Sequence, residues 1–153
     1  MSNDYVSVEV TKILKDKDLI PPQNLAMAAA WIMGNYKALN LKIYDCSKSS
    51  SLTDFYILAS TTNSTQSESM AQEISRQLKN NGHEALSKEG IGTSEWALID
   101  FGDIIVHIFQ ESARDVYDLD HLWRNLPQLS IPNEYYFSAT GTEKPKKADE
   151  GYF

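Results

Sequence analysis

Two aspartates and a histidine lie close together around a single glycine. The segment Asp100-Phe101-Gly102-Asp103 joins two apolar runs, and His107 lies within the second run. Carboxylates near an imidazole can hold a divalent cation, so a metal or nucleotide site at Asp100, Asp103 and His107 is one interpretation. The triplet Asp-Phe-Gly also matches the metal-binding triplet of protein kinases, but the chain lacks a glycine-rich phosphate loop and a catalytic-loop motif. The simpler interpretation is a tight turn.

A second pair of carboxylates, Asp118 and Asp120, resembles the metal-holding pair of nucleotidyltransferases. The apolar spacing around this pair predicts a helix, however, and residues two apart on a helix point about 200° away from each other. They cannot share one ion in that arrangement. We interpret them as part of a solvated helical face.

The remaining groups that could bind metal are scattered. Three histidines without zinc-type spacing accompany a single cysteine, Cys46. They are His83, His107 and His121. We therefore expect no metal and no other cofactor. His107 lies between apolar residues of a predicted strand, which favours a core histidine bonded to a backbone oxygen or to a carboxylate such as Asp54 or Asp100.

The two apolar runs predict a β-hairpin, with Gly102 free to adopt a positive φ in the turn. Alternation along the first run places Trp96, Leu98 and Asp100 on one side, and Ala97, Ile99 and Phe101 on the other. Both sides are apolar. Either helices cover both sides, or one side is an exposed patch that binds another protein.

The rest of the chain predicts helices and strands that form a single mixed sheet with flanking helices, of the α/β or α+β class. Helices are expected over about 23–38, from a capping box at 65–68 to 81–82, and from 112 to before 127. Strands are expected at 41–45, 54–60 and 85–89, with 54–60 at the centre of the sheet. Residues 1–22 form a partly ordered arm, 23–126 the domain, and 127–153 a proline-interrupted extension expected to be flexible.

Composition limits the class of partner. The 153 residues carry a net charge of −7 with a pI near 4.9, which disfavours direct binding to nucleic acid and favours a basic protein partner. One cysteine, no leader-like start and no apolar run of about 20 residues predict a cytoplasmic protein without a membrane role.

Several segments occur in an order and spacing that are specific in combination. They are 53–60, Asn63-Ser64, Glu89-Gly90, 95–110, and Arg114 with Tyr117, Leu119, Leu122 and Trp123. In these segments, from about residue 23 to 123, the chain resembles the ribosomal silencing factor family, also called the RsfS or Iojap family.

The resemblance implies a fold related to nucleotidyltransferases that lacks their catalytic residues, and thus a protein that is not an enzyme. Family members bind universal large-subunit ribosomal protein number fourteen, prevent the small subunit from joining, and so reduce translation when nutrients are scarce. Carried onto matching positions, the contact residues would be Trp96, Leu98, Asp100, Phe101 and Asp103.

Two alternatives stay open at this point. A degenerate nucleotidyltransferase-like protein could still bind nucleotide or metal. Family members can also form homodimers, and a dimer that used the same apolar strand face would compete with ribosome binding.

Overall fold

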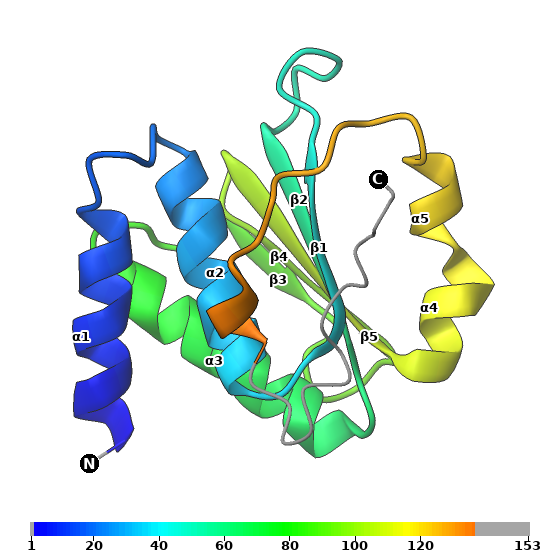
Figure 1. The fold of residues 1–153 in the computed structure, drawn as a ribbon. Coiled ribbons are helices and arrows are strands. Elements are labelled where there is room, and N and C mark those ends of the chain that lie inside the picture. Colours follow the sequence, from blue (N-terminus) through cyan, green and yellow to red (C-terminus); the bar gives the residue numbers. More distant parts are fainter. Residues whose placement is uncertain (1, 137–153) are drawn as a thin grey trace.

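The computed structural model describes residues 2–136 of the chain, which form one sheet with helices on both faces (Figure 1). Five strands lie in the order β1-β2-β5-β4-β3, and only β2 and β5 are parallel to each other. The elements are α1 (Ser2–Leu14), α2 (Gln23–Asn35), β1 (Leu39–Asp45), β2 (Phe55–Thr61), α3 (Ser64–Asn80), β3 (Ser87–Glu89), β4 (Trp96–Asp100), β5 (Ile104–Gln110), α4 (Glu111–Tyr117), α5 (Leu119–Leu122) and the 3₁₀ turn η1 (Asn133–Tyr135). This mixed α/β arrangement confirms the predicted fold class.

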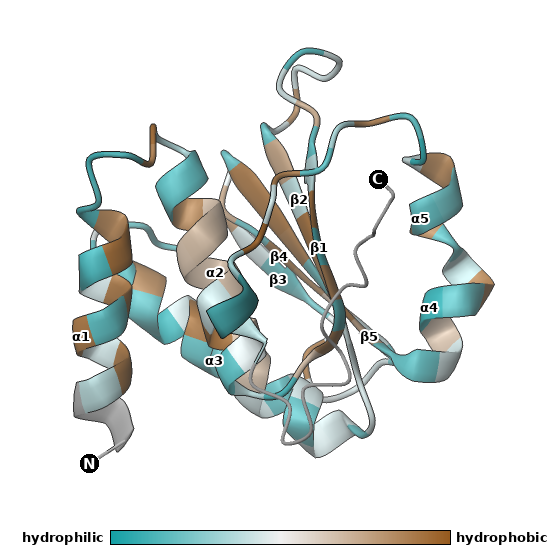
Figure 2. Ribbon diagram, viewed as in Figure 1, coloured by the Kyte–Doolittle hydropathy of each residue, from teal (hydrophilic) through white to brown (hydrophobic). Residues whose placement is uncertain are grey.

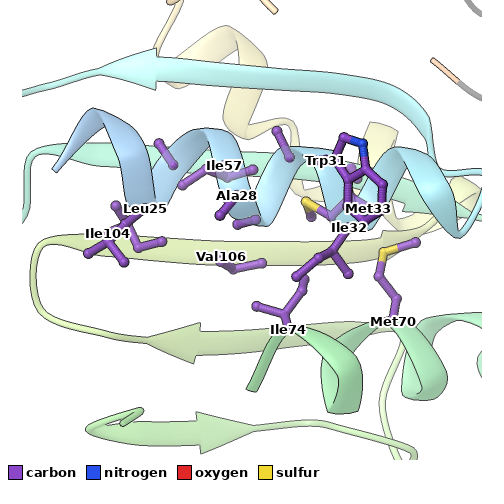
Figure 3. Packing of buried hydrophobic residues seen from close by; sticks show 14 of the residues in the cluster. Leu25, Ala28, Trp31, Ile32, Met33, Ile57, Met70, Ile74, Ile104 and Val106 are labelled. Atoms are coloured by element: carbon purple, nitrogen blue, oxygen red, sulfur yellow. The ribbon is translucent and has the colours of Figure 1, made fainter. Parts of the chain in front are cut away.

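Helices α2 and α3 cover one face of the sheet over β1, β2, β5 and β4. Every residue of α2 from Leu25 to Gly34 is buried, which is why its sequence is apolar on all sides rather than on one stripe. Helix α3 is amphipathic and adds Met70 and Ile74 to the same core, next to Ile32 of α2 and Val106 of β5 (Figure 3). The strand β2, predicted to be central, is an interior strand buried on both sides.

The N-terminal segment is a full helix, where the sequence suggested only a partly ordered arm. Val6 and Val10 of α1 are buried against α2, and Tyr5 packs its ring 5.8 Å from that of Trp31. An isolated apolar helix such as α2 would expose its outer side to water, so α1 supplies the cover that this side needs.

The segment that follows α5 is also ordered up to residue 136, contrary to the expected flexible extension. It lies along the edge of β1, where the Asp45 amide donates to the Pro127 carbonyl and the Leu129 amide donates to the Ile43 carbonyl. Tyr135 then enters the main core. Of the prolines in the extension, Pro127 and Pro132 lie in this ordered segment, and Pro145 lies outside the described residues.

The N-cap of helix α3 lies two residues before the first residue of the predicted capping box. The N-cap is Asn63, whose side chain accepts from the Gln66 amide at 2.8 Å. The side chain of Gln66 reaches back to accept from the Thr62 amide at 2.9 Å. This reciprocal pair of hydrogen bonds resembles a capping box, but Asn63 rather than Thr65 is the N-cap residue.

The other face of the sheet is covered by α4 and α5, but only in part. Helix α4 packs on β2 and β5, around a smaller core that contains Tyr44, Leu58 and Phe109. The sequence predicted one helix here, and the structure has two because Asp118 adopts a left-handed conformation, with φ of 51°. Figure 2 shows the apolar residues concentrated on the strands and a mixture of polar and apolar residues on the outer helices. Within the described residues, no helix is long and apolar enough to cross a membrane.

The order of α1 is tested by two matched substitutions on that helix. Val10 is fully buried, whereas Val8 is 52% exposed. We expect Val10→Ala to lower the free energy of unfolding by about 2 kcal/mol, since it removes two buried methyl groups and leaves a cavity. Val8→Ala should change it by less than about 0.5 kcal/mol. Urea unfolding measures both, and equal small effects would show that α1 does not belong to the folded core.

Candidate protein-binding face

The hairpin β4–β5 forms as predicted, with Trp96 opposite Phe109 and Asp100 opposite Ile105. Gly102 has φ of 88°, a conformation that side chains other than glycine's rarely tolerate. The Asp100 carboxylate accepts from the Gly102 amide at 2.8 Å and closes the turn. The plain turn interpretation of this Asp-Phe-Gly segment is therefore confirmed.

Part of the sheet face that carries α4 and α5 is not fully covered by these helices, and Tyr117 of α4 lies against Trp96 at its boundary. Alternation and strand register place side chains of β3, β4 and the start of β5 on this uncovered part. We call it the open face, defined by Ser87, Glu89, Trp96, Leu98, Asp100 and Ile105. The last four are partly exposed and the first two are exposed, whereas the alternate residues Ala97 and Ile99 are buried under the helical layer on the opposite face.

Three of the five predicted contact residues lie together on the open face: Trp96, Leu98 and Asp100. Asp103 is exposed in the adjoining turn. Phe101 does not lie on the open face, because it is only 9% exposed and packs in the main core on the opposite side of the sheet. The reason is the strand alternation itself, since Phe101 follows Ile99 by two residues and shares its side.

Trp96 is held on several sides. Its indole nitrogen donates to Nδ1 of His107 at 3.1 Å, and its ring lies 5.1 Å from that of Phe109 and 4.6 Å from that of Tyr117. His107 was predicted to be a core histidine, and it is 5% exposed. Its predicted partner was wrong, because the imidazole accepts at Nδ1 from the indole and does not donate to a carboxylate or backbone oxygen among the described residues.

The protonation state of His107 follows from this environment. Burial, reinforced by the nearby positive charge of Arg114, lowers the pKa of His107 to about 4. The imidazole is neutral at pH 7, so Nδ1 can accept and the proton resides on Nε2. Nε2 is buried and has no hydrogen-bond partner among the described residues.

Hydrogen bonds of Arg114 link α4 to α5 and to the sheet. Its guanidinium, only 4% exposed, donates to Asp120 at 2.7 Å and to the Ser60 hydroxyl at 2.9 Å. Asp120 also accepts from the Tyr44 hydroxyl at 2.6 Å and pairs with Lys42 at 3.4 Å. Burial of Asp120 opposes ionisation, but the hydrogen bonds and charge of Arg114 outweigh it and lower the pKa of Asp120 to about 2.

The pair Asp118 and Asp120 therefore differs from its predicted role. Asp118 lies in the break between two helices, and Asp120 is an ion-paired anchor rather than part of a solvated face. Within residues 2–136, no three histidine, cysteine or carboxylate side chains gather as a metal-binding group. Asp100, Asp103 and His107 therefore do not form one such group.

The open face combines apolar side chains with negative charge. Trp96, Leu98 and Ile105 provide the apolar part, whereas Glu89 and Asp100 provide carboxylates beside them. Asp103 adds a further carboxylate from the turn. Aromatic and aliphatic side chains within an acidic rim suit a protein partner with a basic surface.

Sequence reasoning missed two residues of this region. Ile105 was assigned only to the second apolar run, although the register of the hairpin pairs it with Asp100 on the open face. Tyr117, 45% exposed, contacts Trp96 from α4. The hairpin register could have identified Ile105, but the contact from Tyr117 depends on how α4 folds back over the sheet.

The lowered pKa of His107 predicts a loss of stability in mild acid. The unfolded chain takes up a proton near pH 6.5, whereas the folded chain does so only near pH 4, so stability falls as pH drops through this window. Between pH 7.5 and pH 5 we expect the free energy of unfolding to fall by about 2 kcal/mol from this residue. Urea unfolding of the chain and of His107→Leu at both pH values measures it, and an equal fall in both proteins would contradict the prediction.

Comparison with known proteins finds the same family over most of the chain. The family model described as "Ribosomal silencing factor during starvation" matches residues 20–151. The ribosomal silencing factor RsfS of Haemophilus influenzae is 37% identical over 87 residues, which are 57% of this chain and 85% of that protein. The RsfS protein of Bacillus subtilis is 28% identical over 71% of this chain and 92% of its own length. The chloroplastic Iojap protein of Arabidopsis thaliana also matches, at 25% identity over 71% of this chain and 45% of its own.

Solved structures agree with the fold. A crystal structure of a protein from Chromobacterium violaceum superposes with a TM-score of 0.66 at 28% identity, and covers 78% of this chain and 100% of its own. A second structure, from Bacillus halodurans, has a TM-score of 0.59 at 28% identity and covers 70% and 94%. The family model, the relatives and the shared fold confirm the resemblance, and the chain belongs to the ribosomal silencing factor family, RsfS.

Proposed function

We propose that this ribosomal silencing factor docks its open face on the large ribosomal subunit, through universal large-subunit ribosomal protein number fourteen, and blocks the joining of the small subunit. The observation that carries the proposal is the uncovered part of the sheet, where Trp96, Leu98 and Ile105 remain partly exposed although a helical layer buries the opposite face. Apolar side chains left open on a folded domain are typical of a surface that binds another protein.

Charge supports a basic partner for this face. Glu89, Asp100 and Asp103 surround the apolar side chains, and the whole chain carries a net charge of −7. A negative surface steers a basic protein toward it and opposes direct contact with ribosomal RNA. A partner on the ribosome is consistent with the cytoplasmic location that the sequence leads us to expect for this chain.

The mechanism is steric and needs no chemical turnover. The hairpin binds, and the helices and sheet behind it occupy volume at the surface where the small subunit would approach. We propose no enzymatic activity and no cofactor for the chain. A second copy that bound through the same face would hide Trp96 and compete with the ribosome.

Trp96→Ala tests the anchor of the face. We expect binding to the large subunit to weaken by about 2 kcal/mol, or about 30-fold, since aromatic residues at the centre of an interface often contribute this much. Co-sedimentation with isolated large and small subunits measures binding, and light scattering measures joining. Val8→Ala, on the far helix α1, is the matched control and should behave as the unchanged protein. A folded Trp96→Ala protein that binds and blocks joining normally would contradict the proposal.

Asp100→Asn tests the charge separately from the turn. The asparagine side chain retains an oxygen that can accept from the Gly102 amide, so the hairpin should survive while one negative charge is lost. We expect affinity at low salt to fall about fivefold, as one Coulomb contact of about 1 kcal/mol is removed. Asp18→Asn, an exposed position near α1, makes the same change of charge elsewhere. Equal effects of both substitutions would show that total charge matters and the location on the open face does not.

A further inference from the structure

We propose that His107 is a positioning residue for Trp96: its imidazole holds the indole ring in the orientation that docks on the large subunit. The inference deepens the docking proposal above and rests on it. His107 itself is buried, so it acts through Trp96 and not by touching the partner.

The hydrogen bond between Trp96 and His107 restricts the orientation of the indole ring. Trp96 lies opposite Phe109 and His107 lies opposite Leu98, so the bond from the indole to Nδ1 runs diagonally between β4 and β5 on one face. At 3.1 Å it is a well-formed hydrogen bond. An indole has a single polar hydrogen, and therefore this one bond determines which edge of the ring faces the sheet.

The aromatic neighbours of Trp96 constrain its orientation less specifically. Phe109 and Tyr117 pack against the ring, with centroids 5.1 Å and 4.6 Å away, but ring contacts accept a wider range of geometries than a hydrogen bond does. The hydrogen bond to Nδ1 is the contact that depends on which edge of the indole faces the sheet. The exposed edge that a partner meets is consequently set by His107.

Stability alone does not account for a histidine at this position. Its Nε2 is buried without a partner among the described residues, and a buried donor left without an acceptor lowers the stability of the folded state. Aromatic rings surround it, with those of Tyr56 and Trp123 centred 5.8 Å and 5.5 Å away. An apolar side chain would suit this environment better, so the specific gain from histidine is the acceptor at Nδ1.

The test uses substitutions that keep or remove that acceptor in the full chain. His107→Leu and His107→Asn branch at the same atom, but only asparagine can place an oxygen where Nδ1 lies. The oxygen of His107→Gln lies one bond farther from the backbone, so this substitution provides a second variant without an acceptor at the position of Nδ1. The indole ¹H–¹⁵N signal of Trp96, assigned with Trp96→Phe, reports the hydrogen bond and the mobility of the ring. Large-subunit affinity is measured by co-sedimentation, and thermal unfolding confirms that each variant is folded.

We expect the His107→Leu protein to unfold at the same or a higher temperature than the unchanged protein. Its Trp96 indole signal should shift and broaden, and it should bind the large subunit about three- to tenfold more weakly. His107→Gln should do the same to the signal and the affinity, and His107→Asn should restore both. The proposal is overturned if the indole signal is unchanged in the leucine and glutamine variants. It is also overturned if the signal changes while affinity stays the same and Trp96→Ala still weakens binding. If Trp96→Ala itself binds normally, the docking face is wrong and the positioning role falls with it, which separates the two failures.

Discussion

A five-stranded sheet has two faces whose apolar residues must be kept from water, and the described helices cover one face over β1, β2, β5 and β4 and the other face over fewer strands. Helices α2 and α3 cover the first face, and α1 in turn covers α2. On the second face α4 packs on β2 and β5, Asp120 of α5 bonds to Tyr44 of β1, and β3 and β4 remain open in part. This unequal cover determines where the core lies, where Trp96 is partly exposed, and where we propose that a partner binds.

The covered part of the second face depends on a buried charge. Arg114 would be costly to bury alone, and Asp120 compensates it while Ser60 and Tyr44 complete the hydrogen bonds. The left-handed residue Asp118 turns the chain so that Asp120 can reach back to Arg114. The same turn brings Trp123 against Tyr56, with ring centres 3.9 Å apart, and so fixes the boundary between covered and open sheet.

Local patterns predicted most of the elements, because alternation and helical spacing depend on neighbours in the sequence. The hairpin at Gly102 and the shared side of Trp96, Leu98 and Asp100 follow from period-two alternation alone. Long-range pairings were missed, since nothing local indicates that residues 127–129 lie along β1 or that Asp120 meets Arg114. The indole partner of His107 was missed for the same reason, and the residues beyond 136 are not described.

Hydroxyl-radical footprinting measures directly whether the open face is the surface that contacts the large ribosomal subunit, as we propose. The chain would be oxidised free and bound to isolated large subunits, and the modified side chains quantified by mass spectrometry. We predict strong protection of Trp96 and Leu98 on the open face, and no protection of Tyr5 on α1, which is 54% exposed in the free protein. Protection of Tyr5 with continued oxidation of Trp96 would contradict the account, because binding would then occur through the opposite side of the molecule.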